Sequence, residues 1–179
     1  QDTVDRLAEG SAAAQPSTLP RILFIGSSQT WGSGASGDDT HMIHLVTQGL
    51  NAEGARFDVA NASIQGAKSP FLLERYTAEW HRWEPQIMVL NLSTNDVDVV
   101  AYEASLRAFV TGNNAQKVRT IFILEPNASD STREPVEPKH VVMRKVAEEL
   151  KVPVIDLHAH LIAEKGAGLL WWDHVHLTD

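Results

Sequence analysis

Short apolar runs alternate with mixed apolar and polar stretches along most of the chain. The first run starts at Arg21 and breaks at Gly26 into glycine and hydroxyl residues. A continuous apolar run is typical of a parallel strand whose two faces are both covered. Four further runs have the same character, so the pattern predicts strands at 21–26, 56–61, 86–92, 120–124 and 152–156.

Helices are predicted between these strands. Asp38, Asp39 and Thr40 are candidate N-caps for a helix that ends near residue 53 and is closed by Gly54. Ser69-Pro70 begins a second helix, because proline is tolerated at the first helical position. Further helices are expected at 99–110, at 137–150 and from the fifth strand to near residue 165. This alternation predicts an α/β fold, a three-layer sandwich around a five-stranded parallel sheet.

Composition narrows the class of protein. The 179 residues give room for one domain with a full core. A net charge of −8 argues against a nucleic-acid binder, whose affinity depends on neutralising phosphates. The absence of cysteine excludes disulfides, thiol catalysis and cysteine zinc sites. No run approaches the ~20 apolar residues of a membrane helix. Oligomeric state and compartment stay open, with a periplasmic or secreted location slightly preferred.

The two ends of the chain differ from this pattern. Residues 1–20 contain a small-residue, proline-containing stretch and are interpreted as a lead-in or linker before a domain over 21–179. The last residues, 171–179, lack a helix pattern, although domains of this class usually close with a helix. We therefore expect the C-terminal helix of the domain to be missing.

Small polar residues follow several of the predicted strands, where the carboxyl ends of a parallel sheet form a crevice. A serine hydroxyl needs a base to attack a carbonyl, and the base needs a third group to orient it. Ser28, His176 and Asp173 supply these three types of group. The amides of Ser28 and Gly66, with the side chain of Asn95, are candidate donors to the oxyanion of a tetrahedral intermediate.

These motifs resemble the SGNH hydrolases, the superfamily of GDSL-like esterases and lipases. Residues 26–32, Gly-Ser-Ser-Gln-Thr-Trp-Gly, resemble the block G-D-S-x-T-x-G, and Gly66 falls at the glycine of the second block. Residues 93–96, Ser-Thr-Asn-Asp, resemble G-x-N-D, and residues 173–176 resemble D-x-x-H. The resemblance implies Ser28 as nucleophile, His176 as base, Asp173 as its partner, and an oxyanion hole at Ser28, Gly66 and Asn95. It also implies a flavodoxin-like strand order, 2-1-3-4-5, and no cofactor or metal.

The chain departs from these motifs at two positions. Ser27 stands where the first block has aspartate, and Ser93 stands where the third has glycine. Neither position transfers a proton in the family's mechanism, so the two departures affect only the shape and charge near the nucleophile. Ser27 stays an alternative nucleophile, and His174 an alternative base.

Other residues have two interpretations each. His158 and His160 share a face of an extended segment and suggest a metal site, but the start of a helix explains them better. His41 and His44 are spaced for one face of a helix. Aromatic residues close to the predicted site either pack in the core or form a wall against an acyl or sugar group. They are Trp31, Trp171 and Trp172.

The hypothesis is a serine esterase that hydrolyses small acyl esters, acetyl above all, through an acyl-enzyme. Its expected substrate is a small-molecule or glycan ester, with O-acetyl groups on carbohydrate favoured. The alternatives are an O-acyltransferase with the same triad and a non-catalytic carbohydrate-binding domain with a relic site.

Overall fold

Five parallel strands form one sheet in the computed structural model, which describes residues 18–126, 136–164, 170–171 and 176–179. Their order is β2-β1-β3-β4-β5, which confirms the α/β fold and the strand order that the resemblance implies. The strands are β1 (Arg21–Gly26), β2 (Asp58–Asn61), β3 (Ile87–Asn91), β4 (Arg119–Ile123) and β5 (Val154–Ile155).

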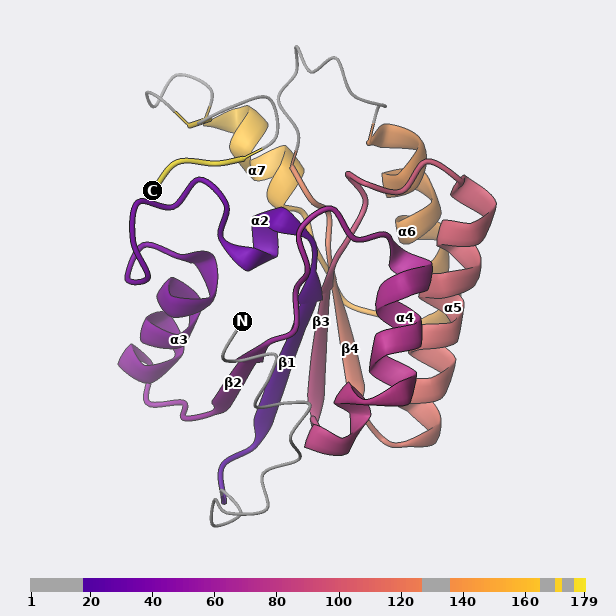
Figure 1. Ribbon diagram of the computed structural model, residues 1–179, viewed down its shortest axis with the longest axis horizontal. Helices are drawn as coiled ribbons and strands as arrows, with labels where there is room; N and C mark the ends of the chain where they lie inside the picture. The colour runs from indigo at the N-terminus through magenta and orange to yellow at the C-terminus, as the bar shows by residue number, and fades with distance from the viewer. Residues whose placement is uncertain (1–17, 127–135, 165–169, 172–175) are drawn as a thin grey trace.

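Helices cover both faces of this sheet (Figure 1). One face carries α4 (Ser69–Ala78), α5 (Val99–Ala115) and α6 (Glu137–Leu150), and the other carries α3 (Met42–Ala52) and α7 (Leu157–Ala163). A single turn, α2 (Ser28–Trp31), follows β1 directly, and a 3-10 helix, η1 (Trp80–Trp83), follows α4. Because the strands are parallel, all of them end at the same edge of the sheet, and α2 lies at this edge.

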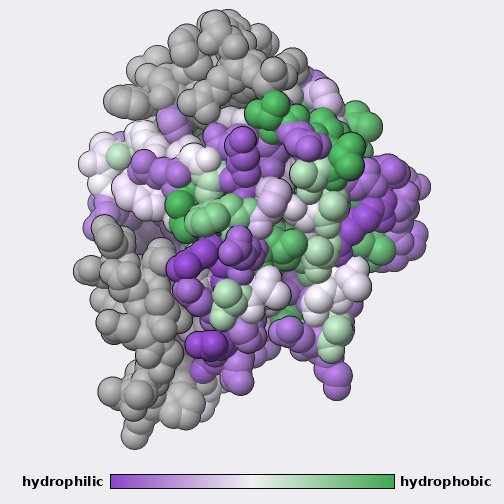
Figure 2. All heavy atoms as spheres, turned by 45° about the vertical axis from the view of Figure 1, so that its right-hand side comes forward, coloured by the Kyte–Doolittle hydropathy of each residue, from purple (hydrophilic) through white to green (hydrophobic). Residues whose placement is uncertain are grey.

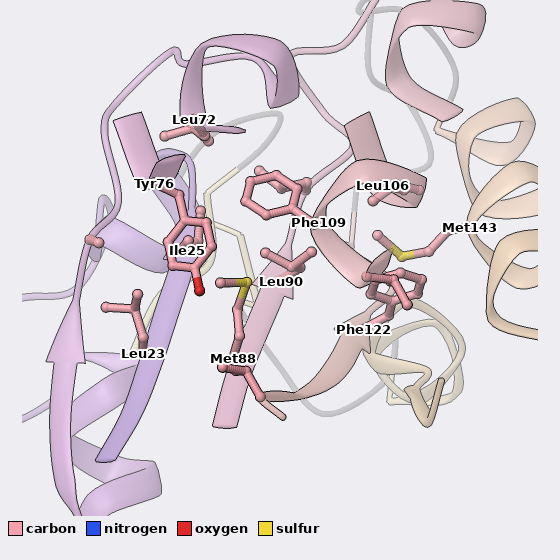
Figure 3. Close-up of a cluster of buried hydrophobic side chains, with 14 of the residues drawn as sticks. Leu23, Ile25, Leu72, Tyr76, Met88, Leu90, Leu106, Phe109, Phe122 and Met143 are labelled. Carbon is pink, nitrogen blue, oxygen red and sulfur yellow. The ribbon is translucent and has the colours of Figure 1, made fainter. Parts of the chain in front are cut away.

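The core has two parts because alternate strand residues point to opposite faces. Leu23 and Ile25 of β1 pack in the larger cluster under α4–α6, whereas Ile22 and Phe24 pack in the smaller cluster under α3. Figure 3 shows the larger cluster, where Tyr76 and Phe109 from the helices lie over Ile25 and Leu90 from the strands. Burial on both faces explains why β1 and β3 are nearly continuous apolar runs in the sequence.

The start of α3 differs from the prediction. The helix begins at Met42, and its N-cap is His41, whose Nδ1 accepts a hydrogen bond from the Ile43 amide at 3.1 Å. Thr40 instead closes a turn by bonding Gly37. A histidine ring nitrogen thus replaces the expected aspartate or threonine, and His41 does not share a helix face with His44.

Other element boundaries differ by a few residues. Helix α5 extends to Ala115, five residues beyond the prediction, and the strands β2 and β5 are shorter than expected. Helix α6 spans the predicted 137–150, and α7 begins at Leu157 with Asp156 as its N-cap. The helical interpretation of His158 and His160 is therefore confirmed.

The surface over α4–α6 is mostly hydrophilic, with hydrophobic residues gathered toward the upper end in Figure 2. At the start of α5, Val97 and Val100 are 62% and 80% exposed. Among the described helices, none is long and apolar enough to cross a membrane.

Candidate active site

Ser28 lies at the carboxyl end of β1, where the chain turns directly into α2. Gly26 allows this turn, because a Cβ there would lie 2.0 Å from Thr30 Oγ1 and 2.9 Å from the Asn91 carbonyl oxygen. The neighbours Ser27 and Gln29 are buried, whereas Ser28 itself is half-buried. The turn therefore presents Ser28, rather than Ser27, toward the crevice.

His176 approaches Ser28 from the other end of the chain. Its Nε2 lies 2.9 Å from the Ser28 Oγ, within hydrogen-bond distance, although 148 positions separate the two residues. Figure 1 shows the C-terminal segment passing over α2. A histidine at this distance can accept the hydroxyl proton of an attacking serine.

The segment that carries His176 is held by backbone contacts on one side and by the Asp179 side chain on the other. Leu177 forms an antiparallel bridge with Trp171, and the Thr178 amide donates to the Leu170 carbonyl at 3.0 Å. Asp179 Oδ1 accepts from the Ser36 amide at 2.7 Å. These contacts tie the segment to the loop that follows α2, so the histidine and the serine share one scaffold.

Asn95 and Gly66 lie in the loops that follow β3 and β2. The Asn95 Nδ2 donates to the carbonyl of Ala67, the residue after Gly66, at 3.3 Å. Asn95 is half-buried and Gly66 is exposed. The structure thus joins the two loops that carry the predicted oxyanion donors, at the same sheet edge as Ser28.

Glu125, which follows β4, was not among the candidate site residues, yet it lies at the centre of this edge with no exposed surface. Its Oε2 accepts from the Thr94 amide at 2.7 Å, the Thr94 hydroxyl at 2.6 Å and the Ser93 hydroxyl at 3.2 Å. Its Oε1 accepts from the Ser27 hydroxyl at 3.2 Å. Burial raises the pKa of Glu125, and these hydrogen bonds oppose the rise.

A second buried carboxylate, Asp96, joins the loops after β2 and β3. Its Oδ1 accepts from the Ser69 amide at 2.9 Å and from the Ser69 hydroxyl at 2.8 Å, at the start of α4. Burial raises the pKa of Asp96, while the bonds from Ser69 and the charge of Lys139 oppose the rise. In the sequence, Asp96 is the last residue of the block that resembles G-x-N-D, whereas the only signal for Glu125 is a carboxylate placed just after a strand.

The remaining predicted site residues fall in different places. Asp173 and Trp172, with the alternative base His174, lie outside the described residues. Trp31, at the end of α2, is 45% exposed, and Trp171 is half-buried. No group of three or more metal-ligating side chains occurs in the part of the chain that the structure describes.

An apolar cavity of about 360 Å³ lies on the α3 side of α2. Its walls include Met42, Leu45, Ile123 and Leu177. Neither Ser28 nor His176 is among the residues that line it, so we do not assign it to the acyl group.

Comparisons with known proteins agree with this fold. Solved structures with the same fold include the acetylxylan esterase Axe2 from Geobacillus stearothermophilus, with 21% identity, a TM-score of 0.75 and coverage of 89% of this chain and 87% of that one. A lipase/acylhydrolase from Enterococcus faecalis has 22% identity, a TM-score of 0.75 and coverage of 90% and 88%. LAE5, a hydrolase from the metagenome of Lake Arreo, has 18% identity, a TM-score of 0.76 and coverage of 88% and 87%.

No curated protein matches the sequence. The family model of the GDSL-like lipases and acylhydrolases matches residues 24–179, which include every strand of the sheet but the first residues of β1. The chain therefore belongs to the GDSL-like lipase/acylhydrolase family and is an ester-hydrolysing enzyme.

Proposed function

We propose that the enzyme is a serine esterase that hydrolyses small acyl esters, acetyl esters above all, through an acyl-enzyme. The observation that carries this proposal is the 2.9 Å distance between His176 Nε2 and Ser28 Oγ. A non-catalytic relic site has no reason to keep a serine hydroxyl against a histidine brought from the far end of the chain. The contact therefore supports catalysis over the binding-domain alternative.

In the proposed mechanism His176 accepts the Ser28 proton as Oγ attacks the ester carbonyl. The amides of Ser28 and Gly66, with the Asn95 side chain, donate to the oxyanion. Each such donor typically contributes about 3–4 kcal/mol to the transition state. His176 then returns the proton to the leaving alcohol, and water releases the acid by the same route. Asp173 is proposed to orient His176, and no metal or cofactor takes part.

An O-acetyl group on a carbohydrate is the substrate that we favour. Trp31 lies three residues after Ser28 and exposes 45% of its surface, as an aromatic side chain that stacks on a sugar ring would. Axe2, which has the same fold, is an acetylxylan esterase. We expect Trp31→Ala to lower kcat/KM for acetylated oligosaccharides at least tenfold and to leave p-nitrophenyl acetate hydrolysis within twofold. Equal effects on both substrates would contradict a sugar contact.

The test of the nucleophile is Ser28→Ala, with p-nitrophenyl acetate as substrate. We expect kcat to fall by about 1000-fold or more, because the acyl-enzyme cannot form. Ser105→Ala is the matched control, since its hydroxyl donates to the Ala101 carbonyl within α5, away from Ser28 and His176. Parental activity in Ser28→Ala would refute the proposal, and acyl transfer to a glycan that outpaces hydrolysis would favour the acyltransferase alternative.

A further inference from the structure

The Glu125 carboxylate connects the ends of three strands. The residue follows β4, its Oε1 is bonded by Ser27 after β1, and its Oε2 is bonded by Ser93 and Thr94 after β3. Ser27 immediately precedes the proposed nucleophile, and Thr94 immediately precedes Asn95. One buried side chain thus spans the two loops whose separation sets the distance from nucleophile to oxyanion donor.

We propose that Glu125 is a positioning residue of the esterase, whose carboxylate fixes the loop of Ser28 against the loop of Asn95. This proposal rests on the proposed roles of Ser28 and Asn95. Glu125 has no exposed surface and so cannot contact a substrate, which separates it from the catalytic residues. Its effect passes through hydrogen bonds to the residues next to them.

The two departures from the family motifs support this role. The first block has an aspartate where this chain has Ser27, and the third has a glycine where it has Ser93. Both hydroxyls donate to Glu125, each at 3.2 Å. Without these hydroxyls, Oε1 would lose its bond to Ser27 and Oε2 would keep only Thr94. Ser27, Ser93 and Glu125 therefore form one hydrogen-bonded group.

From the hydrogen bond between Ser27 and Glu125 we predict that Ser27→Asp, which restores the residue of the motif, lowers activity. A second carboxylate would face Glu125 in a buried space, where two like charges repel strongly. We expect kcat to fall at least tenfold. Adding Glu125→Gln removes one charge and supplies an N–H donor to the new aspartate, so the double variant should recover to within about threefold of the parent. Full activity of Ser27→Asp alone would overturn the proposal.

The main test compares Glu125→Ala with a variant of another buried polar residue. A loss of alignment of about 1 Å costs on the order of 100-fold in rate, so kcat for p-nitrophenyl acetate should fall by about 100-fold in Glu125→Ala. KM should change less than about threefold, because no substrate contact is removed. The rate at which a p-nitrophenyl phosphonate modifies Ser28 should fall in parallel.

Asn113→Ala is the matched control. Asn113 is fully buried, accepts from the Tyr76 hydroxyl at 3.0 Å and donates to Thr120 at 2.9 Å near the start of β4, at the opposite end from Glu125. Its loss should lower stability without lowering kcat of the folded protein. Both variants are assayed at a temperature where near-UV circular dichroism shows them folded.

Glu125→Gln separates the effect of the hydrogen bonds from the effect of the charge. It also replaces Glu125→Ala as the test if the alanine variant does not fold. The amide oxygen can replace Oε2 and keep the bonds from Ser93 and Thr94, and its NH₂ can donate to the Ser27 hydroxyl. We expect kcat within about threefold of the parent. A loss as large as that of Glu125→Ala would overturn positioning by hydrogen bonds.

The outcomes separate this proposal from the proposed function. If Ser28→Ala is inactive and Glu125→Ala keeps the parental kcat, Glu125 has no positioning role and the esterase assignment stands. If Ser28→Ala retains parental activity, the proposed function itself fails, whatever Glu125 does.

Discussion

At the scale of one residue, Gly34 decides whether His176 can reach Ser28. Gly34 has a φ of +98°, and a Cβ there would lie 2.1 Å from the Leu177 carbonyl oxygen and 3.2 Å from the His176 Cβ. An alanine at this position must therefore push the C-terminal segment away from α2. We expect Gly34→Ala to lower kcat for p-nitrophenyl acetate at least tenfold, because it displaces the proposed base from the proposed nucleophile.

Gly54→Ala controls for the backbone strain in that prediction. Gly54 also has a positive φ, +78°, so an alanine there bears a similar left-handed strain of about 1–2 kcal/mol. Among the described residues, no atom lies within 4 Å of the position that an alanine Cβ would take at Gly54. We expect Gly54→Ala to lose stability but keep kcat. Equal losses of kcat in the two variants would show that strain, rather than the displacement of His176, is the cause.

Single residues differ in how far the sequence predicts them. The approach of His176 to Ser28 follows from the order of the motifs, since each lies near the same sheet edge. Glu125 could not be found in this way, because a carboxylate followed by proline after a strand is typical of an exposed turn. Its burial arises only when loops from β1 and β3 close over it, and no local pattern encodes that closure.

At the scale of the element, the N-cap of α5 allows a direct test of how much one capping side chain stabilises a helix. Asp98 Oδ1 accepts from the amides of Val100 and Ala101, at 2.9 and 3.0 Å. Its removal leaves two amides of the first turn without this partner, so Asp98→Ala should lower the free energy of unfolding by about 1 kcal/mol. Asp98→Asn should lose much less, because asparagine caps nearly as well. Urea denaturation measures the free energy of unfolding of both variants, provided that the dependence on urea concentration keeps the slope of the parent. Equal losses of stability in the two variants would contradict the capping role.

The elements themselves follow from the sequence where a local signal is strong. Helix α6 matches the predicted 137–150, since its amphipathic pattern is long and a proline marks its first turn. Helix α2 was not predicted, because four residues are too few for any periodicity. The start of β2 and both ends of β5 differ from the prediction, since backbone pairing with a neighbour, rather than side-chain pattern, determines where an edge strand begins and ends. The strand order came only from the family resemblance.

At the scale of the whole molecule, a layer of buried ionisable groups lies between the sheet edge and the helices. His140 of α6 is 6% exposed, and its Nε2 donates to the Glu125 carbonyl at 3.0 Å. Its ring packs edge-on against His158 of α7 at 5.0 Å. Burial, with the charge of His158, lowers the pKa of His140 to about 4, while Asp156 and Glu137 oppose the shift. Protonation of His140 therefore makes the free energy of unfolding depend on pH.

The sign of this coupling can be tested with His140→Gln. Between pH 6.5 and 4 the unfolded chain binds a proton at His140 that the folded protein does not, so stability falls as the pH falls through this window. A depression from 6.5 to about 4 corresponds to about 3 kcal/mol. Glu125 and Asp96 act oppositely, because their raised pKa values let the folded protein bind protons first. At each pH, subtracting the free energy of unfolding of His140→Gln from that of the parent cancels the contribution of these two carboxylates. We therefore expect the advantage of the parent over this variant to shrink by about 3 kcal/mol from pH 7 to pH 4, and a difference that is constant with pH would refute a neutral buried His140.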